Sequence, residues 1–378
     1  MNNPIWLMTS ALKSLTLNEV INATQKVGAQ GMELCVFRRD GTRTDHVATH
    51  LDYDHFGPEQ AQQLIQTCQQ QRLRFSVGAY ENLIGGPEED RINNQNHLLK
   101  LIRIAHLCGG NANQVNVGTF VGYNHDLGIQ DRGFEKNLDE YVRVFSPIIR
   151  YAEDLGVTLI YENCPMEGWR PATAPTTYNN LPGCLAARKL MYTLIPSQAH
   201  GETYDPSHDV WQNINPSDVI RASDIHRIKH VHVKATRNLN SNGRIHWGAM
   251  YPMQTVRPEL AQKAGIPQPA HEWDRHHYEP MLPGFGGNDS MDWREFLLTL
   301  MQVGFNGPFV IENEADNSAH TGNLPATLQG FQAAVMCLAP IVWPLTPEYG
   351  YQWNHSQWPE LSNPNHKDIP VRTIKELQ

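Results

Sequence analysis

Strand-type and helix-type segments alternate along most of the chain, and this alternation limits its possible folds more than any other feature. Short apolar runs predict strands at residues 5–8, 31–36, 74–78, 114–118, 157–161, 201–204, 228–233 and 308–311. Apolar residues at helical spacing predict helices at residues 17–28, 60–71, 97–108, 134–155, 185–194, 219–226, 296–303 and 324–338. Eight such strand–helix units predict an α/β fold, a single (β/α)8 TIM barrel.

Two segments do not fit the repeat. Glu312, at the end of the eighth predicted strand, lies 80 residues after His232 in the seventh, which is too long an interval for one unit. We therefore expect an insertion over about residues 236–288, rich in Pro, Gly, His and Trp, which forms an ordered lid. Residues 1–343 then form the barrel domain. Residues 344–378 have little periodicity, and we expect a C-terminal extension that wraps the barrel or meets another subunit.

Composition narrows the class of protein. Of the 378 residues 40% are hydrophobic and 18% are charged, as in a folded globular domain. A net charge of −9 without a dense Lys/Arg run argues against a nucleic-acid partner. No apolar stretch reaches about 18 residues, so we expect no membrane-spanning helix, and the N-terminus lacks the pattern of a signal peptide. The six cysteines are scattered without a CxxC pair. Together these features favour a cytoplasmic enzyme.

Four predicted strands end in side chains that commonly bind metals: Glu162, Asp205, His232 and Glu312. Parallel barrel strands gather their C-terminal ends on one rim, where barrel enzymes carry out their chemistry. Three carboxylates and one imidazole form an oxygen-rich ligand set. Such a set suits Mn²⁺, our first expectation, and also Mg²⁺ or Co²⁺, with Zn²⁺ as a further alternative.

Each of these residues also has a purely structural interpretation. Glu162 could be an exposed carboxylate at a strand end, and Asp205, which precedes a proline, could simply begin a turn. His232 shares a strand face with His230, which we expect to be a packing residue. Glu312 competes with Glu314 two residues later. The occurrence of four such strand ends in series favours one shared site over four unrelated features.

The segments around these positions resemble the xylose isomerase-like TIM barrel superfamily, which includes sugar isomerases, ketose 3-epimerases and endonuclease IV-type enzymes. Residues 152–163, 205–208, 230–234 and 310–312 are similar to the motifs of its fifth to eighth strands. The resemblance spans about residues 4–343 and is specific in the second half of the barrel.

This resemblance implies roles for individual residues. The four strand-end residues would bind one divalent metal, and Glu162 and Glu312 would also form the acid/base pair on opposite faces of a sugar. His208 would contact a substrate oxygen, and Arg237 would hold substrate hydroxyls. Lys234 is also expected to bind substrate. Many members of the family carry an acidic residue directly after this lysine, whereas here alanine follows it.

Other polar residues allow more than one interpretation. Glu167 and Trp169 would line the substrate site from the loop after the fifth strand, or cap that loop. Residues 274–277 resemble an Asp-Arg-His motif that supplies extra metal ligands in endonuclease IV, but we favour a solvated polar loop. Cys164 has no neighbouring base in the sequence pattern that would activate it as a nucleophile.

The function that the resemblance implies is a divalent-metal-dependent isomerase or epimerase. It would act on a sugar or keto-sugar by proton transfer through an enediolate that the metal stabilises. A metal-dependent lyase or glycoside-cleaving enzyme acting on 3-keto sugars is the alternative. An endonuclease IV-like phosphodiesterase fits less well, because the third and fourth strands end without histidine. We also expect the chain to form a homo-oligomer and to act on a small-molecule sugar. We expect neither nucleic acid nor a membrane as a partner.

Overall fold

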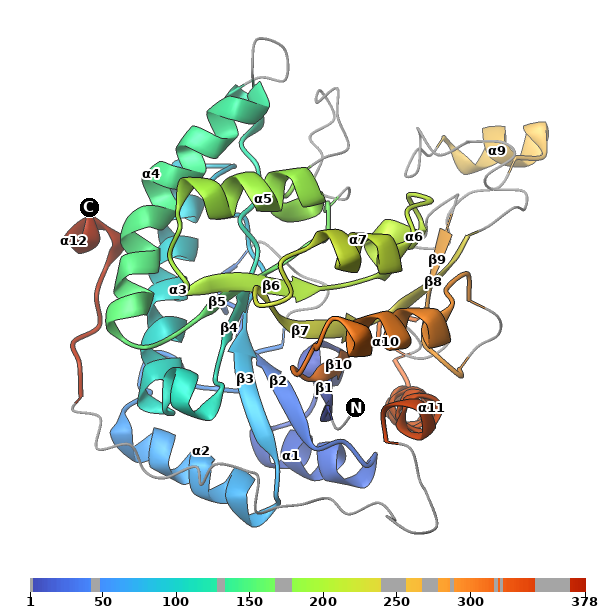
Figure 1. Ribbon diagram of the computed structural model, residues 1–378, viewed down its shortest axis with the longest axis horizontal. Coiled ribbons are helices and arrows are strands. Elements are labelled where there is room, and N and C mark those ends of the chain that lie inside the picture. Colours follow the sequence, from blue (N-terminus) through green and yellow to red (C-terminus); the bar gives the residue numbers. More distant parts are fainter. Residues whose placement is uncertain are drawn as a thin grey trace.

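Eight parallel strands close into a barrel at the centre of the molecule (Figure 1). The computed structural model describes residues 3–41, 48–127, 133–166, 179–238, 256–266, 278–285, 289–315, 319, 322–343 and 368–378. The barrel strands are β1 (Ile5–Met8), β2 (Gly31–Cys35), β3 (Arg74–Gly78), β4 (Val117–Thr119), β5 (Leu159–Glu162), β6 (His200–Tyr204), β7 (Ile228–Val233) and β10 (Phe309–Ile311). Their order around the barrel is β1-β10-β7-β6-β5-β4-β3-β2. The predicted TIM barrel is thereby confirmed.

Except for α9 (Pro258–Ala264), the helices surround the barrel and bury their apolar sides against it (Figure 1). The longer ones are α1 (Leu17–Lys26), α2 (Pro58–Gln70), α3 (Glu88–Leu107), α4 (Gly133–Asp154), α5 (Leu185–Leu194), α10 (Trp293–Gln302) and α11 (Leu324–Val342). The shorter ones are α6 (Ser207–Val210), α7 (Pro216–Ala222), α9 (Pro258–Ala264) and α12 (Ile374–Leu377). Local sequence fixes several of their first turns. Thr16, for example, begins α1 in a reciprocal capping box with Glu19.

Some predicted element boundaries were wrong, for physical reasons. The helix expected at residues 97–108 begins at Glu88, because its polar first half hides the apolar spacing. Three acidic residues in its first turn favour that start through the helix dipole. The strand expected at residue 114 begins at Val117, because Gln114 has φ of 58° and ends a 3-10 turn. The helix expected at residues 219–226 is α7, which starts earlier and ends at Ala222.

The interval between β7 and β10 adds a small second sheet near the C-terminal rim. Strands β8 (Ala235–Asn238) and β9 (Tyr278–Met281) pair antiparallel, with Arg237 opposite Glu279. Strand β8 contacts α6, and Tyr278 of β9 stacks on Trp211 at 5.1 Å between ring centroids. The β8–β9 hairpin of the insertion therefore packs beside the rim on which β5, β6 and β7 end.

The C-terminal part of the chain covers two sides of the barrel. Helix α11 contacts β1 and β10 and buries Phe331 and Leu338 against them. By length and composition α11 could cross a membrane, and 39% of its most apolar window is buried. Residues 368–378 pack on α3 and α4, where the backbone N–H of Ile374 donates to Asn96 Oδ1 at 2.7 Å. This described part of the tail lies against the barrel itself.

Candidate active site

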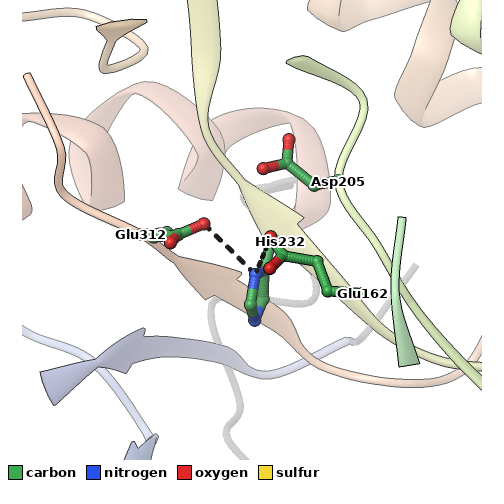
Figure 2. Close-up of side chains that lie close together, drawn as sticks. All are labelled: Glu162, Asp205, His232 and Glu312. Atoms are coloured by element: carbon green, nitrogen blue, oxygen red, sulfur yellow. Dashed lines mark hydrogen bonds and ion pairs between the residues drawn. The ribbon is translucent and has the colours of Figure 1, made fainter. Parts of the chain in front are cut away.

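Four side chains from neighbouring strands converge at the C-terminal rim of the barrel (Figure 2). Glu162 is the last residue of β5, Asp205 directly follows β6, His232 lies near the end of β7, and Glu312 directly follows β10. These strands are adjacent in the barrel, so side chains up to 150 residues apart in sequence meet. Each side chain offers one ligand atom, and the four atoms lie within 4.8 Å of one another. All four residues are buried.

The ring of His232 is held between carboxylates. Its Nδ1 lies 3.2 Å from Glu162 Oε1 and 3.2 Å from Glu312 Oε2 (Figure 2). Burial acts to lower the pKa of His232, but hydrogen bonds to the surrounding carboxylates raise it well above its usual range. A cation that binds Nδ1 would therefore displace a proton from this ring.

The composition of the cluster fits a divalent cation. Three carboxylates and one imidazole are the donors that Mn²⁺, Mg²⁺ and Co²⁺ accept, and no thiolate is among them. Asp205 Oδ2 is buried and accepts no well-aligned hydrogen bond. Its positive neighbours are Lys234 Nζ at 3.0 Å and His208 Nε2 at 3.2 Å, and a divalent cation would supply further positive charge to the three gathered carboxylates. The four residues expected to meet are thus brought together, with Glu312 rather than Glu314 in the group.

Lys234 supplies positive charge to the same cluster. Its Nζ lies 3.0 Å from Asp205 Oδ2, 2.9 Å from Glu312 Oε2 and 2.9 Å from Glu314 Oε2. Burial acts to lower the pKa of Lys234, but these carboxylates raise it well above its usual range. The ammonium therefore stays charged inside the site. Glu314 contacts this lysine and lies outside the four-residue cluster.

Asp205 and His208 are positioned by the chain around the end of β6. Asn163 bridges from the end of β5, donating from Nδ2 to Asp205 O at 2.9 Å and accepting from Asp205 N at 2.7 Å. Asp205 Oδ1 accepts the backbone N–H of Ser207 at the start of α6. The first turn of α6 then directs His208 Nε2 to within 3.2 Å of Asp205 Oδ2 and 3.6 Å of Glu162 Oε1.

The environments of Glu162 and Glu312 shift their pKa values in opposite directions. Burial acts to raise the pKa of Glu162, but hydrogen bonds from His208 and His232 hold it well below its usual range. Burial also raises the pKa of Glu312. Lys234 offsets part of that rise, whereas the nearby Glu314 adds to it, and the pKa of Glu312 stays raised. Two carboxylates with diverging pKa values are typical of an acid/base pair.

Other residues expected at the site lie elsewhere or outside the described residues. Arg237 lies on the β8–β9 hairpin, where its guanidinium pairs with Glu279 and its side chain is 40% exposed. Glu167 and Trp169 lie outside the described residues, as does the segment 274–277. Cys164 is half-buried in the loop that follows β5.

Glu33 also reaches this site, although its position in the sequence did not predict it. It lies in the middle of β2 and is fully buried inside the barrel beneath the cluster. Its Oε2 is 3.2 Å from His230 Nδ1 and 3.5 Å from His232 Nε2. The available signal was a single charged residue within a strand whose other residues are Gly, Met, Leu and Cys. A lone charge in a buried strand requires a partner.

Comparisons with known proteins agree with this architecture. The sequence profile of the xylose isomerase-like TIM barrel family matches residues 21–335. No curated protein matches the chain by sequence. Among solved structures, a D-psicose 3-epimerase studied in the presence of D-fructose is similar, with a TM-score of 0.55 and 12% identity. The match covers 90% of this chain and 99% of that one.

Two further solved structures are similar to the same extent. A D-tagatose 3-epimerase-like protein gives a TM-score of 0.55 at 16% identity, over 89% of this chain and 98% of that one. A probable 3-DHS dehydratase, AsbF of Bacillus anthracis, gives 0.55 at 13% identity, over 88% and 98%. At these identities the similarity demonstrates a shared fold.

Proposed function

Because the chain belongs to the xylose isomerase-like TIM barrel family, we propose that it is a divalent-cation-dependent isomerase or epimerase of a sugar or keto-sugar. The observation that carries the proposal is the convergence of Glu162, Asp205, His232 and Glu312 at the catalytic rim of the barrel. Similarity to a D-psicose 3-epimerase and to a D-tagatose 3-epimerase-like protein supports the substrate class.

The four clustered residues would hold the cation, for which Mn²⁺ is our first choice and Mg²⁺, Co²⁺ or Zn²⁺ are alternatives. When bound, such a cation supplies Lewis acidity that polarises the carbonyl of the substrate and acidifies the neighbouring C–H group.

The two glutamates would divide the proton transfer. Glu162, whose carboxylate is ionised, would accept a proton from the carbon beside the carbonyl. Glu312, whose pKa is raised, is suited to hold and return a proton. Removal of the proton gives an enediolate of the sugar. Return of a proton to the opposite face inverts that carbon, whereas return to the adjacent carbon moves the carbonyl.

Polar side chains around the cluster would bind the sugar hydroxyls. Lys234 presents an ammonium with three donors, and His208 presents a ring nitrogen beside Asp205. Arg237, Glu167 and Trp169 complete the proposed substrate-binding set. We also propose that the only partners of this chain are a small-molecule sugar and further copies of the chain. The six cysteines form no disulfide, which agrees with the cytoplasmic location that we propose.

A lyase that eliminates a β-substituent from a keto-sugar is the second candidate. Its first step is the same deprotonation beside a carbonyl, so the four-residue cluster serves both reactions. The similarity to a probable dehydratase favours it, as does the charged Lys234, which could protonate a departing oxygen. Formation of a dehydrated or cleaved product from a 3-keto glycoside would identify this reaction.

Solvent exchange tests the proposal directly. Metal-stripped protein is incubated in D₂O with ketohexoses, with and without Mn²⁺, and deuterium beside the carbonyl is followed by NMR. We expect exchange and epimer formation only with the cation. Glu162→Gln and Glu312→Gln should each reduce exchange by about 10²- to 10⁴-fold. The exposed Glu295→Gln on α10 is the matched control. Exchange at the wild-type rate in both glutamine variants would refute the mechanism.

A further inference from the structure

A second polar layer lies inside the barrel, directly beneath the four-residue cluster. It consists of Glu33 on β2, Tyr80 just after β3, Asn116 just before β4 and His230 on β7, and we call it the inner polar layer. Glu33 and His230 are completely buried, and Tyr80 and Asn116 are nearly so. Buried polar groups at this depth are expected to be matched by specific hydrogen bonds.

Every member of the layer is connected to Glu33. The hydroxyl of Tyr80 donates to Glu33 Oε1. Asn116 Nδ2 lies 3.2 Å from His230 Nε2 and donates to it, so His230 carries its proton on Nδ1. That Nδ1–H lies 3.2 Å from Glu33 Oε2 and donates to it. Each carboxylate oxygen of Glu33 therefore accepts a hydrogen bond.

The same carboxylate also faces His232 on β7, which is one of the proposed cation ligands. Glu33 Oε2 is 3.5 Å from His232 Nε2, the ring nitrogen on the far side from Glu162 and Glu312. An acceptor at this position favours a proton on Nε2, which leaves the lone pair on Nδ1 for a cation. The ring of Tyr80 packs edge-on against His232 at 6.2 Å between centroids and limits its rotation.

Neighbouring strands leave room for this carboxylate. A Cβ atom at Gly78 of β3 would lie 2.8 Å from Glu33 Oε1, and one at Gly118 of β4 would lie 2.7 Å from it. A Cβ at Gly118 would also lie 2.3 Å from the Tyr80 hydroxyl oxygen. Neither glycine has a positive φ, so the missing side chains provide space rather than backbone freedom.

We propose that Glu33 is a positioning residue for the cation site: its carboxylate faces His232 Nε2 across 3.5 Å, attracts the ring proton to that nitrogen, and so keeps Nδ1 directed at Glu162 and Glu312. Tyr80, His230 and the two glycines fix Glu33 in that orientation. The inference rests on the proposed cation dependence but not on the identity of the substrate.

The test compares Mn²⁺ affinity among variants of the full-length, metal-stripped chain, without substrate. Glu33→Gln keeps the size of the side chain but places an NH₂ group among the histidine nitrogens, which favours a proton on His232 Nδ1. We expect its dissociation constant for Mn²⁺ to rise about 10- to 100-fold. Glu33→Asp keeps an acceptor and should recover most of the affinity. Tyr80→Phe removes only the donor to Oε1 and should change affinity less than Glu33→Gln.

Two further readouts separate positioning from simple loss of stability. Unfolding temperatures in EDTA report the structural effect of each variant. Affinity losses that merely follow those temperatures across Glu33→Gln, Glu33→Asp and Tyr80→Phe would overturn the proposal. In ¹⁵N-histidine-labelled protein loaded with Zn²⁺, we expect the His232 proton on Nε2, and a proton on Nδ1 would overturn it.

The result can be distinguished from failure of the proposed function. A chain that binds Mn²⁺ in a Glu33-dependent manner but exchanges no proton with ketoses contradicts the enzymatic proposal and supports the positioning role. A wild-type chain that binds neither Mn²⁺ nor Zn²⁺ overturns the positioning role. If Glu33→Gln does not fold, Glu33→Asp and Tyr80→Phe still test the proposal through affinity and the NMR of the Zn²⁺-loaded protein.

Discussion

The pKa of a buried ionisable side chain in this barrel depends on the groups that it contacts. Lys234 is buried among carboxylates, which keep it charged. His97 and His200 are just as buried but contact mainly neutral groups, and burial lowers the pKa of each to about 4. The same loss of water therefore keeps Lys234 charged at the candidate site and keeps the rings of His97 on α3 and His200 on β6 neutral.

His200 should make the stability of the protein depend on pH. Its Nε2 contacts Ile195 O at 2.7 Å and its Nδ1 contacts the Tyr141 hydroxyl at 3.2 Å. Its pKa falls from 6.5 to about 4 on folding, so the unfolded chain binds more protons between these values. Its contribution is fully present above pH 6.5 and is lost on acidification, by about 1.4 kcal/mol per pH unit.

His200→Gln should remove this dependence, because glutamine can still donate to the Ile195 carbonyl but does not titrate. Urea unfolding of both proteins at pH 7.5, 6 and 5 measures the effect. We expect the wild type to lose more free energy of unfolding than the variant as the pH falls. Equal losses in the two proteins would contradict the assignment.

At the scale of elements, a buried ion pair joins α5 to β6. Arg188 Nε lies 2.9 Å from Glu202 Oε2, and both side chains are almost completely buried. Arg188 Nη1 also donates to Pro182 O at 3.0 Å, in the turn before α5. This outward face of β6 is therefore polar. The pair fixes how α5 lies on the strand that carries Asp205 at its end.

Arg188→Met should lower the free energy of unfolding by about 3–5 kcal/mol, because it leaves the Glu202 carboxylate buried without its counter-charge. Burial already raises the pKa of Glu202 despite the arginine. The double variant Arg188→Met with Glu202→Leu should be more stable than Arg188→Met alone, since it removes the orphaned charge. Urea titrations of the two single variants and the double variant form the cycle. Additive losses would show that the two residues do not interact.

At the scale of the whole molecule, the end of the chain ties helices together. Arg103 on α3 donates from Nε to Ile369 O at 2.7 Å, and its guanidinium also pairs with Asp368. Ile374 of α12 is 3% exposed and packs where α12 contacts α3 and α4. Residues 368–378 thus cover one side of the barrel, while α11 covers β1 and β10.

Deletion of residues 368–378 should lower the unfolding temperature. Burial of Ile374 alone contributes roughly 2–3 kcal/mol. The deletion also removes Ile369 O and Asp368 as partners of Arg103, which keeps Phe56 O. Differential scanning calorimetry of the full and shortened chains measures the change. Ile374→Ser should reproduce most of the loss, whereas Val371→Ser, at a side chain that is 49% exposed, should have little effect. A shortened chain that melts at the wild-type temperature would exclude a stabilising role for the tail.

The sequence determined the barrel and the four clustered residues. Strand and helix periods are local properties, and in a parallel barrel a strand-end residue must lie on the common rim whatever its exact register. For this reason Glu162, Asp205, His232 and Glu312 were identifiable from their positions alone. Boundaries were less certain where polar residues begin a helix, as at Glu88, or where a left-handed residue delays a strand, as at Gln114.

Tertiary structure alone decided which side chains meet inside the barrel. Glu33 and His232 lie 199 residues apart, and β2 and β7 are not neighbours, so no local pattern links them. Their contact depends on strand register and on the space that Gly78 and Gly118 leave. Strand register also determines that Lys234 contacts three carboxylates and that His232 Nδ1 points toward the cluster. Packing across a closed barrel sets these distances, whereas periodicity fixes only which face of its own element a residue occupies.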